Sequence, residues 1–194
     1  MSLEQKLRTL IREQLISEIS RRTAARKLRI FDFDDTLVKT RSFIHVTTED
    51  GRVFDLTPGE YAVYEKQPGD VMDYSDFEGL IDPQEIAWTV RILRNIVKAG
   101  SEAVILTARG ESQPVAEFLS SARIPRIPII ALGNSDPQAK ADYVRRRIRE
   151  DGIDYVEFFD DSHKNVKAVS SVQNEFPPGT VQIVSRHIVH SPSL

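Results

Sequence analysis

The sequence contains no cysteine among its 194 residues, which excludes disulfide bonds, thiolate metal sites and cysteine nucleophiles. It also has no apolar run long enough to span a bilayer, and its first residues lack the apolar core of a secretory signal. We therefore expect a cytoplasmic protein that makes no contact with membranes.

The chain has little excess charge of either sign. Its net charge is -3 at pH 7, which provides no general argument for binding nucleic acid or an anionic membrane. A length of 194 residues is that of one domain with a substantial core. The function must therefore be inferred from local patterns.

Residues 1–27 are predicted to form an amphipathic helix that packs on the rest of the domain, or on a second copy of the chain in a homo-oligomer. The apolar face of this helix consists of Leu3, Leu7, Leu10, Ile11, Leu15 and Ile19. Its end is basic and consists of Arg21, Arg22, Arg26, Lys27 and Arg29. We interpret this basic group as a solvated face in preference to a contact with a phosphate backbone.

An apolar run at residues 28–33 is typical of a buried strand in a parallel sheet. Asp32, Asp34 and Asp35 lie at its end. Because alternate residues of a strand face the same way, Asp32 and Asp34 are expected to project to one side. Burying them costs several kcal/mol unless a cation or hydrogen bonds compensate, so the pair is a candidate site for Mg2+. The alternative is an acidic turn that caps the next element.

From residue 83 to residue 185 the predicted helices and strands alternate, which is typical of a parallel sheet with helices on both faces. The expected helices are 83–98, 113–121 and 136–150, and the expected strands are 102–107, 127–132, 155–159 and 181–185. Together with the first strand, this pattern predicts a Rossmann-like three-layer α/β sandwich. We expect residues 28–194 to form one domain.

An insert is expected at about residues 39–82. It begins with two β-prone runs at 42–47 and 52–57, around a turn at 48–51, and these predict a β-hairpin. The remainder reads as a loop-rich, acidic stretch. Since the insert directly follows the strand with Asp32, we expect it to lie over the site and to govern selectivity through Arg41, His45 or Arg52.

The ends of the other predicted strands carry polar residues as well. These are Thr107 and Arg109, Asp160 and Asp161 with Asn165 shortly after, and Lys140 near the start of a helix. Each could cap a helix or lie on the surface. In open α/β sheets, however, sites form beyond the carboxyl ends of the strands, so their joint occurrence predicts one site.

These residues resemble the four ordered motifs of the haloacid dehalogenase superfamily of phosphohydrolases. The first motif is matched by Asp32-Phe-Asp34-Asp-Thr36-Leu37 and the second by the strand that ends at Thr107. Lys140 fits the third motif and Asp160-Asp-Ser-His-Lys-Asn165 the fourth. The resemblance spans about residues 28–185 and implies a phosphatase with a flap or small cap formed by the insert. Two departures are Asp35, where glycine is common, and Asn165, which replaces an acid.

The resemblance implies a role for each of these residues. Asp32 would be the nucleophile and Asp34 the general acid and base, assisted by Thr107 and Lys140. Mg2+ would be held by Asp32, the Asp34 carbonyl and Asp161, with Asp160 the alternative ligand and Asn165 more distant. Thr36, Arg109 and Arg41 would contact a small phosphorylated substrate, either a metabolite or a nucleotide.

Three alternatives remain at this stage. The first is a phosphatase of polynucleotide 3′-phosphate ends, which the acidic insert disfavours. The second is a signalling receiver domain, but there the lysine comes last, whereas Lys140 precedes Asp160 and Asp161. The third is a non-enzymatic binding or assembly protein, and the presence of both Asp32 and Asp34 counts against it.

Overall fold

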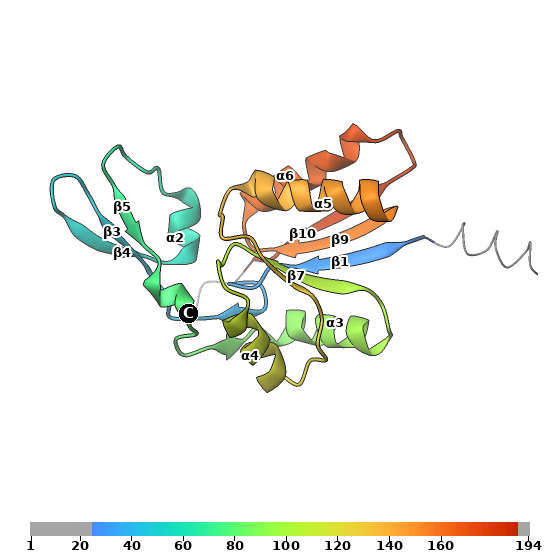
Figure 1. The fold of residues 1–194 in the computed structure, drawn as a ribbon, viewed down its shortest axis with the longest axis horizontal. Coiled ribbons are helices and arrows are strands. Elements are labelled where there is room, and N and C mark those ends of the chain that lie inside the picture. Colours follow the sequence, from blue (N-terminus) through green and yellow to red (C-terminus); the bar gives the residue numbers. More distant parts are fainter. Residues whose placement is uncertain (1–24, 190–194) are drawn as a thin grey trace, which may run out of the picture.

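A five-stranded parallel sheet forms the centre of the computed structural model, which describes residues 25–189 (Figure 1). Its strands run in the order β10-β9-β1-β7-β8. Their bounds are β1 Lys27–Phe31, β7 Ala103–Thr107, β8 Ile129–Ala131, β9 Tyr155–Asp160 and β10 Gln182–His187. The predicted α/β class and the parallel sheet are confirmed.

Helices cover both faces of this sheet (Figure 1). On one face lie α3 (Ala87–Lys98) and α4 (Gln113–Ser121), and on the other lie α5 (Pro137–Asp151) and α6 (His163–Ser171). The side chains of β1 alternate between two buried clusters: Leu28 and Ile30 pack toward α5 and α6, while Phe31 packs toward α3 and α4. Phe31 also stacks on Phe159 of β9, with ring centroids 4.3 Å apart.

The strand order places a switch point beside β1. From β1 the chain proceeds through β7 to β8 on one side, and then crosses to β9 and β10 on the other. Ligand sites of open α/β sheets lie at the carboxyl ends of the strands where the order reverses. A site is therefore expected among the residues that follow β1 and β9.

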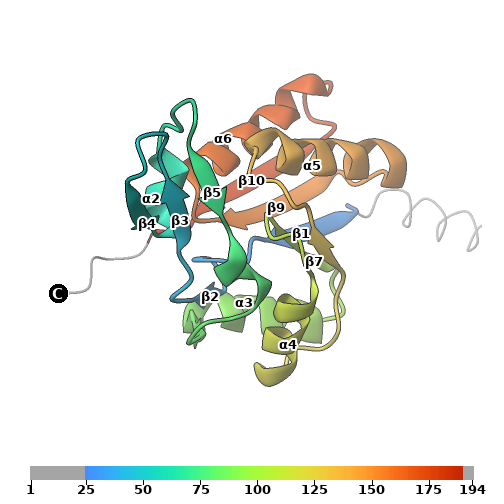
Figure 2. The ribbon, with the colours of Figure 1, turned by 60° about the vertical axis from the view of Figure 1, so that its left-hand side comes forward.

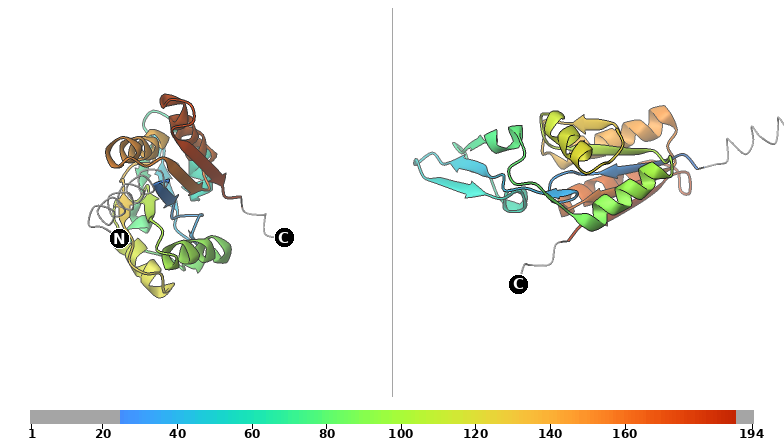
Figure 3. Two further views of the ribbon diagram at one scale, coloured as in Figure 1. Left: turned by 90° about the vertical axis from the view of Figure 1, so that its right-hand side faces the viewer. Right: turned by 90° about the horizontal axis from the view of Figure 1, so that it is seen from below.

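The insert forms a separate small sheet beyond this edge (Figures 2 and 3). Its stem is an antiparallel pair, β2 (Val38–Lys39) with β6 (Gln84–Glu85). Its body is a three-stranded antiparallel sheet in the order β4-β3-β5, accompanied by a helix and a 3-10 turn. The bounds are β3 Ile44–Thr47, β4 Val53–Leu56, α2 Pro58–Val63, β5 Val71–Asp73 and η1 Ser75–Glu78.

The predicted hairpin is confirmed, because β3 pairs with β4 in antiparallel register around the turn. Two other predictions for this region need correction. The stretch after the hairpin is loop-rich, as expected, but it also contains α2, whose capping box joins Thr57 and Glu60, and β5, which pairs with β3. The next helix begins at Ala87 and not at Pro83, because residues 84–85 are used in the stem.

The other predicted elements occur with ends that differ from the prediction by at most two residues. Helix α5 is capped at both ends: Asp136 accepts a hydrogen bond from the Gln138 amide, and Gly152 adopts a left-handed conformation after the last turn. The predicted helix at residues 1–27 lies almost entirely outside the described residues, so its packing on the core or on a second copy stays a prediction. Among residues 25–189, none of the helices combines the length and the apolar character needed to cross a membrane.

His45 makes the stability of the insert depend on pH. Its Nδ1 lies 2.7 Å from Asp55 and its Nε2 lies 3.4 Å from Asp76, while Asp73 is its register partner on β5. The hydrogen bonds to Asp55 and Asp76 raise the pKa of His45. A raised pKa in the folded state means that this stabilisation is complete below the unfolded pKa of about 6.5, and is lost as pH rises through the folded value.

We therefore expect the amides of β3–β5 to open more readily at about pH 9 than at about pH 6, after correction for intrinsic exchange. Hydrogen exchange measured by mass spectrometry tests this. His45→Gln should remove the difference, whereas His187→Gln, outside the insert, should leave it in place. An unchanged pH dependence in His45→Gln would contradict the assignment.

Candidate active site

The turn after β1 positions the first acidic residues. The amide of Asp32 continues the sheet by donating to Phe159 O over 2.9 Å, and the chain then turns back, with Leu37 N donating to Phe33 O. Asp35 has φ 53°, in the left-handed region that glycine adopts most easily and aspartate tolerates. The departure from glycine at this position is therefore compatible with the turn.

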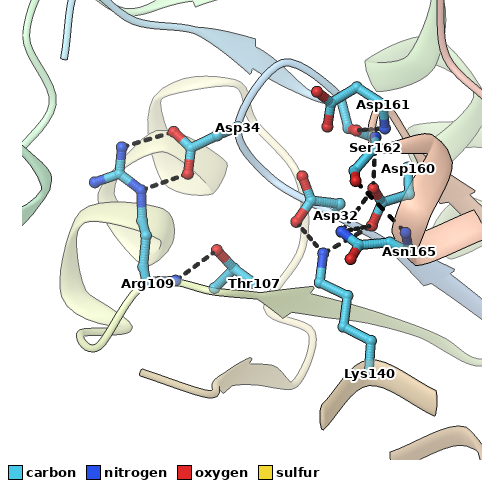
Figure 4. Close-up of polar contacts among 10 residues, drawn as sticks. Asp32, Asp34, Thr107, Arg109, Lys140, Asp160, Asp161, Ser162 and Asn165 are labelled. Carbon is cyan, nitrogen blue, oxygen red and sulfur yellow. Dashed lines mark hydrogen bonds and ion pairs between the residues drawn. The ribbon is translucent and has the colours of Figure 1, made fainter. Parts of the chain in front are cut away.

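A buried lysine joins the ends of β1 and β9 (Figure 4). Lys140 Nζ donates to Asp32 Oδ1 over 2.5 Å and to Asp160 Oδ2 over 2.7 Å. Burial lowers the pKa of Lys140, but Asp160 and Asp32 raise it more, so that the net shift is upward. Lys140 is therefore a fixed cation at the switch point.

Asp160 and Asp161 occupy different environments. The Asp160 carboxylate is fully buried, and it accepts hydrogen bonds from the Ser162 amide and from Asn165 Nδ2 as well as from Lys140. Asp161 instead lines the hollow between the core and the insert. Asp161 thus has the more accessible carboxylate, and Asn165 orients Asp160.

Three carboxylates converge beside Lys140. Oxygen atoms of Asp32, Asp160 and Asp161 all lie within 4.8 Å of one another. Burial, followed by the neighbouring carboxylates and opposed by Lys140, raises the pKa of Asp32. Burial, followed by Asp160 and Asp35, raises the pKa of Asp161 to about 7. One ammonium does not balance three carboxylates, and hard oxygen donors at this spacing fit a divalent cation such as Mg2+.

Asp34 lies outside that cluster but in the same hollow as Asp32. Its two carboxylate oxygens accept hydrogen bonds from Arg109 Nε and Nη2, both over 2.8 Å (Figure 4). The expectation that Asp32 and Asp34 face one side is met, but the side chain of Asp34 does not join the oxygens that could bind a metal. Its partner is Arg109.

Arg109 also binds the insert. Its Nη1 donates to Phe77 O and to Gly79 O, each over 2.8 Å, and its guanidinium lies 5.1 Å from the Phe77 ring centroid. The side chain is 1% exposed. Four of its five N–H groups are therefore used within the protein. Arg109 also lines the hollow, and its predicted contact with substrate stays a prediction.

The remaining predicted residues fall in three places. Thr107 lines the hollow at the end of β7, where its hydroxyl accepts a hydrogen bond from the Arg109 amide. Thr36 is fully buried, and its hydroxyl accepts from the Asp161 amide over 3.1 Å, so it positions this loop instead of reaching a substrate. Arg41 is exposed and pairs with Asp82, and it is not among the residues that line the hollow.

The hollow has a volume of about 950 Å³. Core residues form one wall and insert residues the other, and the latter were not predicted from the sequence: Tyr61, Tyr64, Lys66, Met72, Tyr74 and Phe77. The clustering of three tyrosines and a phenylalanine in residues 61–77 is the one signal that could have drawn attention to this wall.

Comparison with protein-family models and with curated proteins found no match to this chain. The assignment of a function therefore depends on the geometry above and on the motifs in the sequence.

Replacing Lys140 by methionine should strongly destabilise the fold. The change leaves Asp32 and Asp160 buried without their cation, and breaking such a pair costs roughly 3–5 kcal/mol. Urea unfolding in the presence of a chelator measures the loss. Lys164→Met removes an exposed lysine that lines the same hollow and should change the free energy of unfolding little. Equal unfolding free energies for the two variants would contradict the importance of the buried pair.

Proposed function

We propose that this protein is a Mg2+-dependent phosphomonoester hydrolase that acts through a phosphoaspartate at Asp32. The observation that carries the proposal is the position of Lys140 Nζ, in hydrogen-bond contact with both Asp32 and Asp160 at the switch point of the sheet. A fixed cation beside a carboxylate nucleophile offsets the charge of an incoming phosphate. The four sequence motifs that resemble haloacid dehalogenase phosphohydrolases support the same reaction.

The residues suited to hold the metal ion are Asp32 and Asp161, together with the backbone carbonyl of Asp34, with Asp160 behind them. When bound, Mg2+ supplies positive charge that favours the ionised carboxylates and the phosphate dianion at one place. Lys140, in contact with Asp32 and Asp160, supplies the remaining positive charge. Asn165 keeps Asp160 oriented through its amide.

In the first step, an oxygen of Asp32 attacks phosphorus while the bond from phosphorus to the leaving oxygen breaks. A carboxylate nucleophile needs no separate base. Lys140 orients Asp32, and the Thr107 hydroxyl at the hollow donates to a phosphoryl oxygen. Asp34 gives its proton to the leaving alkoxide.

In the second step, Asp34 takes a proton from water. The resulting hydroxide attacks phosphorus, the bond to Asp32 breaks, and inorganic phosphate leaves. Both Asp34 oxygens accept hydrogen bonds from Arg109, so proton transfer requires one of these two bonds to open. Arg109 is a positioning residue for Asp34 in this mechanism.

The charge of the hollow favours a small substrate. Its lining contains seven carboxylates, from Asp32, Asp34, Asp73, Glu78, Glu111, Asp136 and Asp161, against four cations, from Lys66, Arg109, Lys140 and Lys164. A polynucleotide would bring several phosphates toward this acidic lining, whereas a monoester brings one. We therefore propose a small phosphorylated metabolite or nucleotide, and not a polynucleotide end, as the substrate.

The central test is hydrolysis of an aryl phosphate. We expect turnover that requires Mg2+, stops on chelation, and is lost in Asp32→Asn because the amide is a poor nucleophile. Glu111→Gln, which removes an exposed carboxylate from the same hollow, is the matched control and should retain turnover. Undiminished turnover in Asp32→Asn would rule out the phosphoaspartate mechanism.

Asp34→Asn separates proton transfer from metal binding. Loss of general acid–base catalysis should reduce kcat by roughly 10²–10⁴-fold. Because the Asp34 carboxylate lies outside the three-carboxylate cluster, the Mg2+ concentration for half-maximal activity should change little. Steady-state kinetics over a Mg2+ titration measure both quantities. Weakened Mg2+ affinity with normal kcat at saturating metal would make Asp34 a ligand and not a proton carrier.

A further inference from the structure

Aromatic side chains of the insert gather on the wall of the hollow that faces the reacting carboxylates. Tyr61, Tyr64, Tyr74 and Phe77 all line it, and these include three of the five tyrosines in the chain. Phosphate chemistry does not require such residues. The presence of four aromatic side chains on this wall indicates that it contacts a part of the ligand other than the phosphate.

Two of these rings already have other packing partners. The Tyr64 ring packs on Phe54 and its hydroxyl donates to Asp70 over 2.6 Å, while the Phe77 ring packs on Arg109. Because these contacts already occupy the Tyr64 and Phe77 rings, the two rings are less suited to stack on a ligand.

Tyr61 and Tyr74 form what we call the tyrosine pair. Their hydroxyl oxygens are 2.7 Å apart, and their rings meet edge to face with centroids 5.8 Å apart. Tyr74 is 45% exposed although it lines a hollow. The pair is held by its own contacts and presents aromatic surface to the space in front of it.

Hydrogen bonds connect the tyrosine pair to the reacting groups. The Phe77 amide donates to Tyr74 O over 2.9 Å, and Arg109 donates both to Phe77 O and to Asp34. Phe77 and Arg109 thus link Tyr74 to the proposed general acid, Asp34. Arg109, which orients Asp34, therefore also sets the separation between Asp34 and the aromatic wall.

The surroundings select among ligands with aromatic rings. A hollow of about 950 Å³ exceeds the needs of a phenyl phosphate and is of the size that holds ligands as large as drugs or cofactors. The excess of acidic lining residues disfavours ligands with several phosphates. Asn134, Ser135 and Asp136 line the same space and provide polar groups for hydroxyls or exocyclic amines.

We propose that the tyrosine pair is a stacking platform for the base of a nucleoside monophosphate, whose single phosphate is presented to Asp32. Every nucleobase has a planar face, and stacking on an aromatic side chain contributes about 1–3 kcal/mol per base. This proposal rests on the proposed phosphatase function, because it assigns the leaving group of the same reaction.

The test compares a nucleoside 5′-monophosphate with ribose 5-phosphate, which carries a hydroxyl group in place of the base. The wild-type protein should prefer the nucleotide, and Tyr74→Leu or Tyr61→Leu should reduce the ratio of the two kcat/KM values by about 5–100-fold. Tyr74→Phe keeps the ring and should keep most of the preference. Val63→Ala, on the same helix as Tyr61 but exposed and outside the hollow, should leave the ratio unchanged.

The two proposals fail in different ways. Mg2+-dependent turnover with equal kcat/KM for the two substrates, or with a ratio unaffected by Tyr74→Leu, overturns the platform and leaves the phosphatase standing. Absence of turnover on both of these substrates, with the aryl phosphate still hydrolysed, also overturns the platform alone. Absence of turnover on all three substrates overturns the phosphatase.

Calorimetric titration of Asp32→Asn with adenosine 5′-monophosphate then tests the platform by itself. Weaker binding when Tyr74→Leu is added supports the platform. Equal affinity of the two proteins, or no binding by either, overturns it.

Discussion

The contact of one buried ammonium with two buried carboxylates governs the geometry of the site. Lys140 lies 108 residues after Asp32 and 20 residues before Asp160, yet it touches both. This requires β1 and β9 to be neighbours and α5 to begin beside their carboxyl ends, as the strand order and helix bounds provide. The energy of burying these charges is recovered only when all three groups are in place, so the sheet topology and the site stabilise one another.

A second buried cation plays a corresponding part for the insert. Arg109 pairs with Asp34, which is 75 residues away in the sequence, and with two carbonyl groups beside and within η1. Because a guanidinium has several donors in a rigid plane, one side chain can fix three segments at once. The core and the insert are therefore coupled at the point where the proposed proton transfer takes place. A change in the hydrogen bonding of Asp34 would therefore alter the contacts of Arg109 with the aromatic wall.

Where the structure departs from the sequence-based expectations, the causes are physical. The resemblance implied that Thr36 and Arg109 contact the substrate, and the motifs do not reveal their partners within the protein: Thr36 accepts from the Asp161 amide, and Arg109 binds Asp34. The stem pair β2–β6 and the pairing of β5 with β3 depend on strands that are short or separated in sequence, and such strands carry little local signal. The sequence-based start of α3, at Pro83, was too early. Proline is compatible with a first helical turn, but also with the segment that leads into the stem strand β6.

The sequence by itself determined the alternation of strands and helices, the hairpin of the insert, and the polar residues that follow β1, β7 and β9. Hydrophobic periodicity, capping residues and turn glycines are local properties, and they can be read without knowing which segments meet. Only the tertiary structure decided that Lys140 joins Asp32 to Asp160, that Arg109 holds Asp34 and the insert, and that Tyr61 and Tyr74 face the hollow. These contacts depend on strand order and on the position of the insert, and both are settled by the packing of residues far apart in the chain.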